Sequence, residues 1–264
     1  MSEATESGTM GGTAGGHAQG TPNWADLQVP DIAAGLDFYC GLFGWDAGPE
    51  GPPEVGGYRM PRLGGATVCG VGPVMQAGAP PAWTLHFAVD DVDEAAARVA
   101  ARGGAVLFGP MDVLDAVRMG VFADPAGARF GLSQERQVRG FGVTQVPGAF
   151  AWAELATSDL AGARAFYPAV LPGVTEKRRE GELEYHLLVS AGKEVAGMFA
   201  LPDASMRPAW TISFQSADVE RTAARAREAG ADLVMGPTTT PGVGTRAVLR
   251  DPQGATFGLL QPPG

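Results

Sequence analysis

The stretch WADLQVPDIAAGLDFYCGLFGW at residues 24–45 decides the fold, because the chain carries its pattern a second time. A shift of 128 positions brings it onto WAELATSDLAGARAFYPAVLPG at residues 152–173. Residues 83–110 and 124–132 likewise return in recognisable form 127 positions later. An offset this constant over so long a span indicates that one ancestral domain was duplicated in tandem.

The length of 264 residues accommodates two such copies, each large enough for a core of its own. We expect a first domain at residues 23–134, a linker at 135–150 and a second domain at 151–262. Residues 1–22 are rich in Gly, Ser, Thr and Ala and contain no apolar stretch of signal-peptide length. They are expected to form a disordered tail and no targeting signal.

Composition narrows the choice of partner and compartment. The net charge of −10 disfavours binding to nucleic acids and to anionic membranes, because both repel an acidic surface. No stretch approaches the roughly 18 apolar residues that a membrane-crossing helix needs. The two cysteines, Cys40 and Cys69, indicate a reducing compartment and no disulfide framework. The sequence therefore predicts a cytoplasmic protein, monomeric or homodimeric, whose partner is a small molecule.

Each copy alternates strands and helices. Residues 24–29 alternate by two, as a half-buried strand does, and Asp31 precedes a helix with apolar residues at helical spacing. Asp91 precedes a second helix that stops at Gly103-Gly104. Pro168 is expected to shorten or bend the first helix of the second copy. The other strands of the first copy are expected between residues 58 and 74 and at 83–89, 105–109, 117–123 and 128–133.

Three motifs resemble a known superfamily: the first helix with its FYCGLFG at residues 38–44, VDDVD at 89–93, and DPAGARFGL at 124–132. Together they resemble the vicinal oxygen chelate superfamily, which contains glyoxalase I, extradiol dioxygenases, and fosfomycin and bleomycin resistance proteins. The opening GTPNW at residues 20–24 is similar to a narrower actinobacterial group of tandem two-domain members. That group includes a secreted mycobacterial antigen and hydroxylase-like proteins of polyketide clusters.

The resemblance implies an α+β protein with two tandem glyoxalase-like domains. Each domain would be a pair of βαβββ modules, four modules in all, that form cup-shaped mixed sheets. The sequence leaves open whether modules pair within a copy or across copies. Because one fold of this kind hosts many chemistries, the activity has to be argued from the site.

In metal-dependent members of the superfamily, His, Gln or Glu side chains inside the cup bind a divalent ion. A divalent ion needs at least three convergent ligands. The corresponding positions of this chain do not supply that set, so we expect neither a metal site nor another cofactor here. A new metal site built from Asp26 and His86 is the alternative. The positions that correspond to the family ligands are Trp24, Thr84 and Gly131, then Trp152, Thr211 and Gly258, with the last ligand falling among Cys69, Gly70 and Gly197.

Strand alternation predicts which side chains face each cup, because every second residue of a strand points to the same face. If Trp24 and Thr84 face the cup, their alternate neighbours do so as well. The first cup is then expected to hold Trp24, Asp26, Gln28, Thr84 and His86, with Arg118 and Arg129 at its rim. The second cup is expected to hold Trp152, Glu154, Thr211 and Ser213, with Arg246 beside them.

The acids of the cups are the main candidates for chemistry. Asp26 and Glu154 each lie two residues after a tryptophan and therefore beside its ring on the same face of the strand. Desolvation next to that aromatic face would raise the pKa of the acid and suit it to act as a general base. His86 would be its acid partner. Alternatively, the acids pair with Arg118 or another arginine and fix the strand packing, and His86 is a structural, hydrogen-bonded residue.

Trp24 and Trp152 can stack on a flat aromatic ligand, or they can fill the space that a metal ion has left. The sequence favours a metal-independent enzyme of lyase, isomerase or hydroxylase-like type. It would bind a hydrophobic or aromatic small molecule and isomerise, cyclise or hydroxylate it in specialised metabolism. A drug-sequestering protein of the bleomycin-resistance type is the first alternative, and a metal-dependent glyoxalase or dioxygenase is the second. The residues expected to bind substrate are Trp24, Gln28, Thr84, Arg118, Trp152, Thr211 and Ser213, and those expected to catalyse are Asp26, His86 and Glu154.

Overall fold

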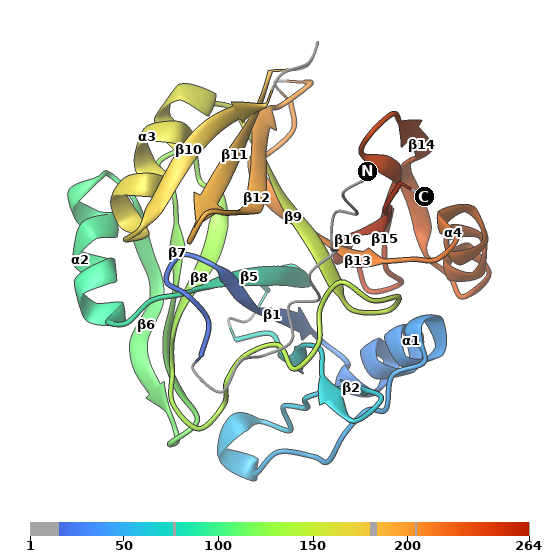
Figure 1. Ribbon diagram of the computed structural model, residues 1–264. Helices are drawn as coiled ribbons and strands as arrows, with labels where there is room; N and C mark the ends of the chain where they lie inside the picture. Colours follow the sequence, from blue (N-terminus) through green and yellow to red (C-terminus); the bar gives the residue numbers. More distant parts are fainter. Residues whose placement is uncertain (1–15, 76–77, 180–183, 204, 264) are drawn as a thin grey trace, which may run out of the picture.

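A computed structural model describes residues 16–75, 78–179, 184–203 and 205–263. Each copy folds into one main sheet with two helices (Figure 1). The first copy contains β1 (Pro22–Val29), α1 (Ile32–Phe43), the short 3-10 helix η1 (Pro53–Val55), β2 (Arg62–Leu63), β3 (Ala66–Thr67), β4 (Gly70–Pro73), β5 (Ala82–Ala88), α2 (Val92–Ala101), β6 (Ala105–Val113), β7 (Val117–Ala123) and β8 (Arg129–Glu135). The second copy contains β9 (Phe150–Thr157), α3 (Leu160–Val170), β10 (Val174–Arg179), β11 (Tyr185–Ser190), β12 (Lys193–Ala200), β13 (Ala209–Gln215), α4 (Val219–Glu228), β14 (Asp232–Thr240), β15 (Gly244–Arg250) and β16 (Thr256–Gln261).

Modules pair within a copy, which answers the question that the sequence left open. In the first copy the strand order is β4-β1-β5-β8-β7-β6, and the antiparallel pair β1–β5 joins the two modules. In the second copy the order is β10-β11-β12-β9-β13-β16-β15-β14, joined by the antiparallel pair β9–β13. The predicted α+β fold of two tandem domains is confirmed.

The helices begin where the sequence predicts. The Asp31 carboxylate accepts a hydrogen bond from the backbone N–H of Ala34, and Asp91 accepts one from Glu94, so both acids cap the first turn of their helix. Helix α1 ends at Gly44, whose φ of 72° lies in the left-handed region that glycine adopts without strain. In α3, Pro168 lies within the last turn, and the helix still spans 11 residues against 12 in α1.

The first module of the first copy is less regular than the others. Where the second copy adds β10 and β11 to its main sheet, the first copy has η1, isolated bridges and the separate pair β2–β3. Pro49, Pro52, Pro53 and Pro61 fall in this segment. Proline lacks an N–H group for a strand ladder, which explains why the segment wraps the sheet edge as a loop.

The two sheets pack against each other through their helix-bearing faces and share one core. Trp83 of β5 lies 5.1 Å from Phe214 of β13 between ring centroids, and Phe87 lies 5.4 Å from Trp210. Figure 1 shows α2 beside α3 on one flank and α1 beside α4 on the other. Because the shared core occupies the helix-bearing faces, the opposite, concave face of each sheet is left for a site.

A pair of matching hydrogen-bond chains joins the copies. The Tyr39 hydroxyl donates to Asp251 Oδ2 over 2.9 Å and accepts from the Trp83 indole over 2.9 Å. Its counterpart Tyr167 donates to Asp124 Oδ2 over 3.0 Å and accepts from Trp210 over 2.9 Å. The Asp-Pro turns that close each copy therefore also bind the other copy.

The segment expected to be a tail is in part bound to the first domain. Residues 1–15 lie outside the described residues, but residues 16–21 make contacts. The backbone N–H of Gly20 donates to the Ala88 carbonyl over 2.8 Å, and His17 Nδ1 lies 2.6 Å from Glu135 Oε1. The expectation that all of residues 1–22 form a disordered tail is thus wrong for its last residues. Within the described segments, no helix is both long and apolar enough to span a membrane.

Candidate functional site

Strand β1 presents alternate side chains to the concave face of the first sheet, as the sequence predicts. Ala25, Leu27 and Val29 are fully buried on the side of the shared core. Trp24 and Asp26 point the other way and lie opposite His86 and Thr84 of β5 in the antiparallel register. The alternation of a pleated strand therefore brings an indole, a carboxylate and an imidazole onto one face.

A cavity of about 930 Å³ opens on this face. That size is typical of small-molecule sites. Its polar floor comes from β1, β5 and β8, and its apolar walls come from β6, β7 and the proline-rich loop before β2. The polar residues of the floor are Asn23, Asp26, Gln28, His86, Arg129, Ser133 and Glu135, and the larger apolar side chains of the walls include Met60, Leu107, Phe108, Met111, Val117, Met119 and Val121.

Asp26 is the centre of a hydrogen-bonded cluster. The Trp24 indole N–H lies 3.0 Å from both Asp26 Oδ1 and the Tyr58 hydroxyl, and that hydroxyl donates to Asp26 Oδ1. His86 Nε2 lies 3.0 Å from the other carboxylate oxygen. The His86 ring is not aligned for a hydrogen bond, and neither of its nitrogens has such a partner among the described residues.

These contacts reverse the pKa shift that the sequence predicts for Asp26. Burial by itself would raise the pKa of this carboxyl. The contact with His86 and the hydrogen bonds from Tyr58 and Trp24 outweigh burial, so the pKa of Asp26 lies below its ordinary value. The expectation of a raised pKa is wrong, because desolvation was considered without the donors that surround the carboxylate. Asp26 is a stable anion at neutral pH.

Glycines make room for this cluster at two positions where the superfamily resemblance places metal ligands. A β-carbon at Gly131 would overlap the imidazole of His86, and one at Gly70 would overlap the Tyr58 hydroxyl. Within the described segments, no group of three or more His, Cys, Asp or Glu side chains converges. With an indole at Trp24 as well, the residues present do not fit a divalent ion that needs three ligands.

The second cup repeats the tryptophan, the tyrosine and the acid, and here an arginine contacts the acid. The Trp152 indole donates to the Tyr185 hydroxyl over 3.0 Å, and that hydroxyl donates to Glu154 Oε1 over 2.8 Å. Arg246 Nη1 lies 2.7 Å from each oxygen of Glu154. The alternative in which an arginine of the cup fixes the acid is therefore correct for Glu154, and Ser213 takes the place of His86.

Two residues predicted to bind substrate do not reach the first cavity. Arg118 turns away from it and pairs with Asp93 over 2.8 Å and Asp112 over 3.0 Å. Its alternate neighbours on β7, Val117 and Met119, line the cavity instead, so Arg118 was assigned to the wrong face. Thr84 is on the predicted face but is 1% exposed and does not line the cavity.

Arg129 does reach the cavity, as predicted, and its Nη2 donates to Gln28 Oε1 over 3.0 Å. Tyr58 and the proline-rich loop were missed, because an irregular segment has no strand alternation to fix its direction. A signal for Tyr58 was nevertheless present: it returns as Tyr185 at the same shift of 127 positions. Cys69 is fully buried, and burial raises the pKa of its thiol well above the ordinary value, so it is not an activated nucleophile.

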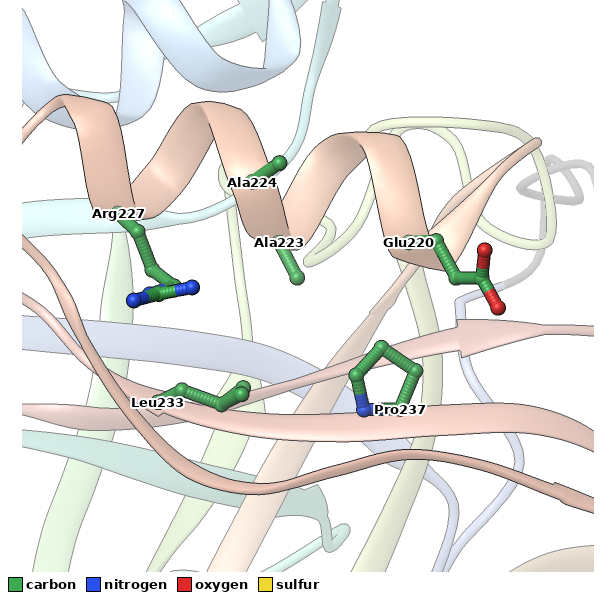
Figure 2. A pocket seen from close by; sticks show the side chains of 6 residues that line it. All are labelled: Glu220, Ala223, Ala224, Arg227, Leu233 and Pro237. Atoms are coloured by element: carbon green, nitrogen blue, oxygen red, sulfur yellow. The ribbon is translucent and has the colours of Figure 1, made fainter.

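A second hollow, of about 240 Å³, lies between α4 and β14 on the outside of the second copy. Figure 2 shows Glu220 and Arg227 at its two ends, with Leu233 and Pro237 facing the helix between them. It contains none of the clustered polar groups of the first cup. We therefore place the candidate site in the first cup.

Residues 21–132 and 149–259 each match the family model of the Glyoxalase/Bleomycin resistance protein/Dioxygenase superfamily. The chain is 40% identical over 263 residues to the anthracycline biosynthesis protein DnrV of Streptomyces peucetius, covering 92% of this chain and 94% of that protein. It is 38% identical over 252 residues to the putative glyoxylase CFP32 of Mycobacterium bovis, covering 93% and 96%.

Solved structures agree with the fold. The 2,3-dioxygenase LapB from Pseudomonas sp. KL28 superposes with a TM-score of 0.65 at 16% identity, covering 94% of each chain. The Mn(II)-bound glyoxalase from Novosphingobium aromaticivorans superposes with a TM-score of 0.63 at 19% identity, covering 93% of this chain and 83% of that one. At such low identities these structures bear on the fold alone.

Proposed function

This chain belongs to the Glyoxalase/Bleomycin resistance protein/Dioxygenase superfamily, as its motifs predicted, and on that premise we propose a function for its first cup. The first cup binds a hydrophobic, aromatic small molecule of specialised metabolism and transforms it by proton transfer, without a resident metal ion. The second cup, whose acid is held by an arginine, serves as scaffold.

The observation that carries this proposal is the clustering of unsatisfied polar atoms in the first cup. Within the described part of the chain, five buried side-chain nitrogen or oxygen atoms lack a hydrogen-bond partner, and three of them belong to His86 and Arg129, which line the cavity. Each such atom costs about 1–3 kcal/mol when it is left unpaired. A cavity floor on which two neighbouring side chains share this cost is expected where a ligand completes the hydrogen bonding.

The walls of the cavity indicate the class of ligand. At its mouth, Met75, Leu107, Met111 and Leu114 remain 39–55% exposed although they are apolar. An apolar ligand would cover these side chains and remove them from water. The role of DnrV, which its name assigns to anthracycline biosynthesis, favours a polycyclic aromatic ketone or quinone as this ligand.

Asp26 and His86 would move the proton. The Asp26 side chain is 15% exposed to the cavity, whereas His86, 2% exposed, lies behind it. A proton that leaves a carbon next to a ligand carbonyl would pass to Asp26, and the electron pair would move to the carbonyl oxygen. His86 would share the proton across the 3.0 Å contact once its ring turns into alignment for a hydrogen bond, and Asp26 would then return it at another carbon, which is an isomerisation.

The absence of a metal ion from the proposal is supported by the space around two glycines at positions where the family has metal ligands. A side chain at Gly131 or Gly70 could not coexist with His86 and Tyr58 where they lie. Elemental analysis of the purified protein tests this point. A divalent ion retained at one equivalent per chain would contradict the proposal and favour a metal-dependent glyoxalase or dioxygenase.

One observation favours capture without turnover. The lowered pKa of Asp26 makes it a weak base, and a fixed anion in an aromatic cup suits a binding protein as well. Sequestration of a planar drug, as in bleomycin resistance, is therefore the second candidate function.

Variants in the two cups separate these functions. A panel of anthraquinones and naphthoquinones would first be screened for binding by tryptophan fluorescence and for conversion by chromatography. For an enzyme, Asp26→Asn and His86→Ala lower turnover about 100-fold or more while binding changes little. Glu154→Gln, the matched change in the second cup, leaves turnover intact. If no compound of the panel binds, or if Glu154→Gln is as damaging as Asp26→Asn, the proposal is wrong.

A further inference from the structure

The cation on the floor of the first cup, Arg129, forms no ion pair within the described residues. Arg129 begins β8 and faces the cavity, while the next residue, Phe130, is buried in the shared core. Among the described residues no carboxylate lies within ion-pair distance of its guanidinium. Its one hydrogen bond goes to the neutral Gln28, and its Nε is buried without a partner.

The second cup shows what a satisfied arrangement looks like. There Arg246 contacts both oxygens of Glu154, so cation and anion of the cup neutralise each other. In the first cup, the corresponding position of Arg246 is Met119, and Asp26 is held by His86 instead. The cation on the floor of the first cup is Arg129, which interacts electrostatically with Asp26 but forms no ion pair with it within the described residues.

The rim does not supply the missing anion. Three acids that line the cavity already have partners: Glu50 pairs with Arg59, Asp112 pairs with Arg118 and Arg136, and Glu135 contacts His17. Glu54 is exposed at the rim. The floor of the cavity therefore carries the anion Asp26 and the half-buried cation Arg129, which form no ion pair with each other, while Arg62 lies exposed at the rim.

A half-buried guanidinium in apolar surroundings is stabilised only when its N–H groups meet acceptors. Its Nη1 makes no hydrogen bond within the described residues, and the Gln28 amide N–H₂ beside it is equally free to donate. Arginine binds carboxylates and other anionic oxygens with a planar fork of donors. Gln28 Oε1 is the acceptor that Arg129 finds among the described residues, and the remaining N–H groups of the two side chains are left as donors without a partner there.

We propose that Arg129 and Gln28 bind an anionic oxygen of the ligand, a carboxylate or an ionised phenol on its aromatic ring system. This inference rests on the proposed function, because it assigns a chemical group to the ligand of the same cup. It also gives the ligand an orientation: its anionic end lies on Arg129 of β8, and its reacting carbon faces Asp26 of β1.

The test compares matched ligands and matched arginines. The probes are anthraquinone-2-carboxylate, its neutral methyl ester and 2-hydroxyanthraquinone, titrated into the full chain by calorimetry at low salt. Wild-type protein should bind the carboxylate about 10- to 100-fold more tightly than the ester, the range expected for a hydrogen bond between charged groups. The hydroxy compound, measured at pH 6 and pH 9, shows whether an ionised phenol serves equally.

Arg129→Gln should remove the preference for the acid and leave the affinity for the ester unchanged, and Arg129→Lys should keep part of the preference. Arg118→Gln is the control, because it removes the same charge from the same sheet on the opposite face. If Arg129→Gln does not fold, Gln28→Leu and the salt dependence of the preference serve instead.

Equal affinity for acid and ester in the wild-type protein, or the same loss of preference in Arg118→Gln, would overturn this inference while leaving the proposed function standing. A failure of all three compounds to bind would instead count against the proposed function.

Discussion

Alkaline pH should unfold this protein steeply, because buried tyrosines resist ionisation in the native fold. Tyr39 and Tyr167 are fully buried. Burial, and then the nearby charges of Asp251 and Asp124, raises the pKa of each phenol well above its ordinary value. In the unfolded chain both phenols ionise near pH 10. A group whose pKa is raised by folding stabilises the fold below its unfolded pKa, and this stability is lost as the pH rises towards the folded pKa.

The slope follows from the number of protons that unfolding releases. Each buried tyrosine contributes about 1.4 kcal/mol per pH unit above pH 10, so Tyr39 and Tyr167 together contribute about 2.8 kcal/mol per unit. The pKa values of Tyr58 and Tyr185 are shifted in the same direction, which steepens the loss. A domain with a stability of about 5–15 kcal/mol would lose it within a few pH units.

Guanidinium unfolding curves from pH 8 to pH 11.5, together with absorbance at 295 nm, measure this effect. Tyrosinate should appear only as the protein unfolds. Tyr167→Phe should lower the slope by about 1.4 kcal/mol per pH unit. It should also destabilise the protein by about 1–3 kcal/mol at pH 7, because Asp124 loses a donor and Trp210 its acceptor. Tyr39→Phe should behave alike. Phenols that titrate near pH 10 in the folded protein, or a stability that stays level up to pH 11, would refute the reasoning.

Three further changes test the two cups. Gly131→Ala places a methyl group into the imidazole of His86, so calorimetry should show about 1–3 kcal/mol lower stability together with weaker ligand binding. Gly258→Ala, its counterpart in the second copy, should destabilise the fold but leave binding in the first cup unchanged; an equal loss of binding would contradict the assignment. Arg246→Met leaves the carboxylate of Glu154 without its cation and should lower the unfolding temperature by several degrees without changing ligand affinity. A fall in ligand affinity in this variant would show that the second cup takes part in binding.

Much of this architecture could be predicted from local pattern. Strand alternation at residues 24–28 turned Trp24, Asp26 and Gln28 to one face, because successive side chains of a strand point to opposite sides. The same reasoning gave the wrong face for Arg118, since the sequence around it does not show which of the two alternating sets is the apolar one: Val117, Met119 and Val121 face the cavity and Phe122 the core. Alternation shows which residues of a strand share a face, but only burial shows which of the two faces is turned to the core.

The direction of the Asp26 pKa shift could not be predicted locally. The groups that hold its charge are Tyr58, 32 positions away, and His86 on another strand. Tyr58 reaches the carboxylate from an irregular loop whose path depends on prolines and isolated bridges. Residues close to Asp26 in the sequence indicate its burial, but Tyr58 and His86, which stabilise its charge, lie far away along the chain.

Sequence by itself determined that the chain is a duplicated domain and which superfamily it belongs to, because spacing and residue type along the chain carry these features. Only the tertiary structure decided that the two cups differ in kind: an arginine neutralises the acid of the second, while in the first an imidazole holds the acid and a separate arginine stays unpaired. Charge pairing depends on distances between strands that are far apart in the chain, and those distances exist only after the sheets have formed.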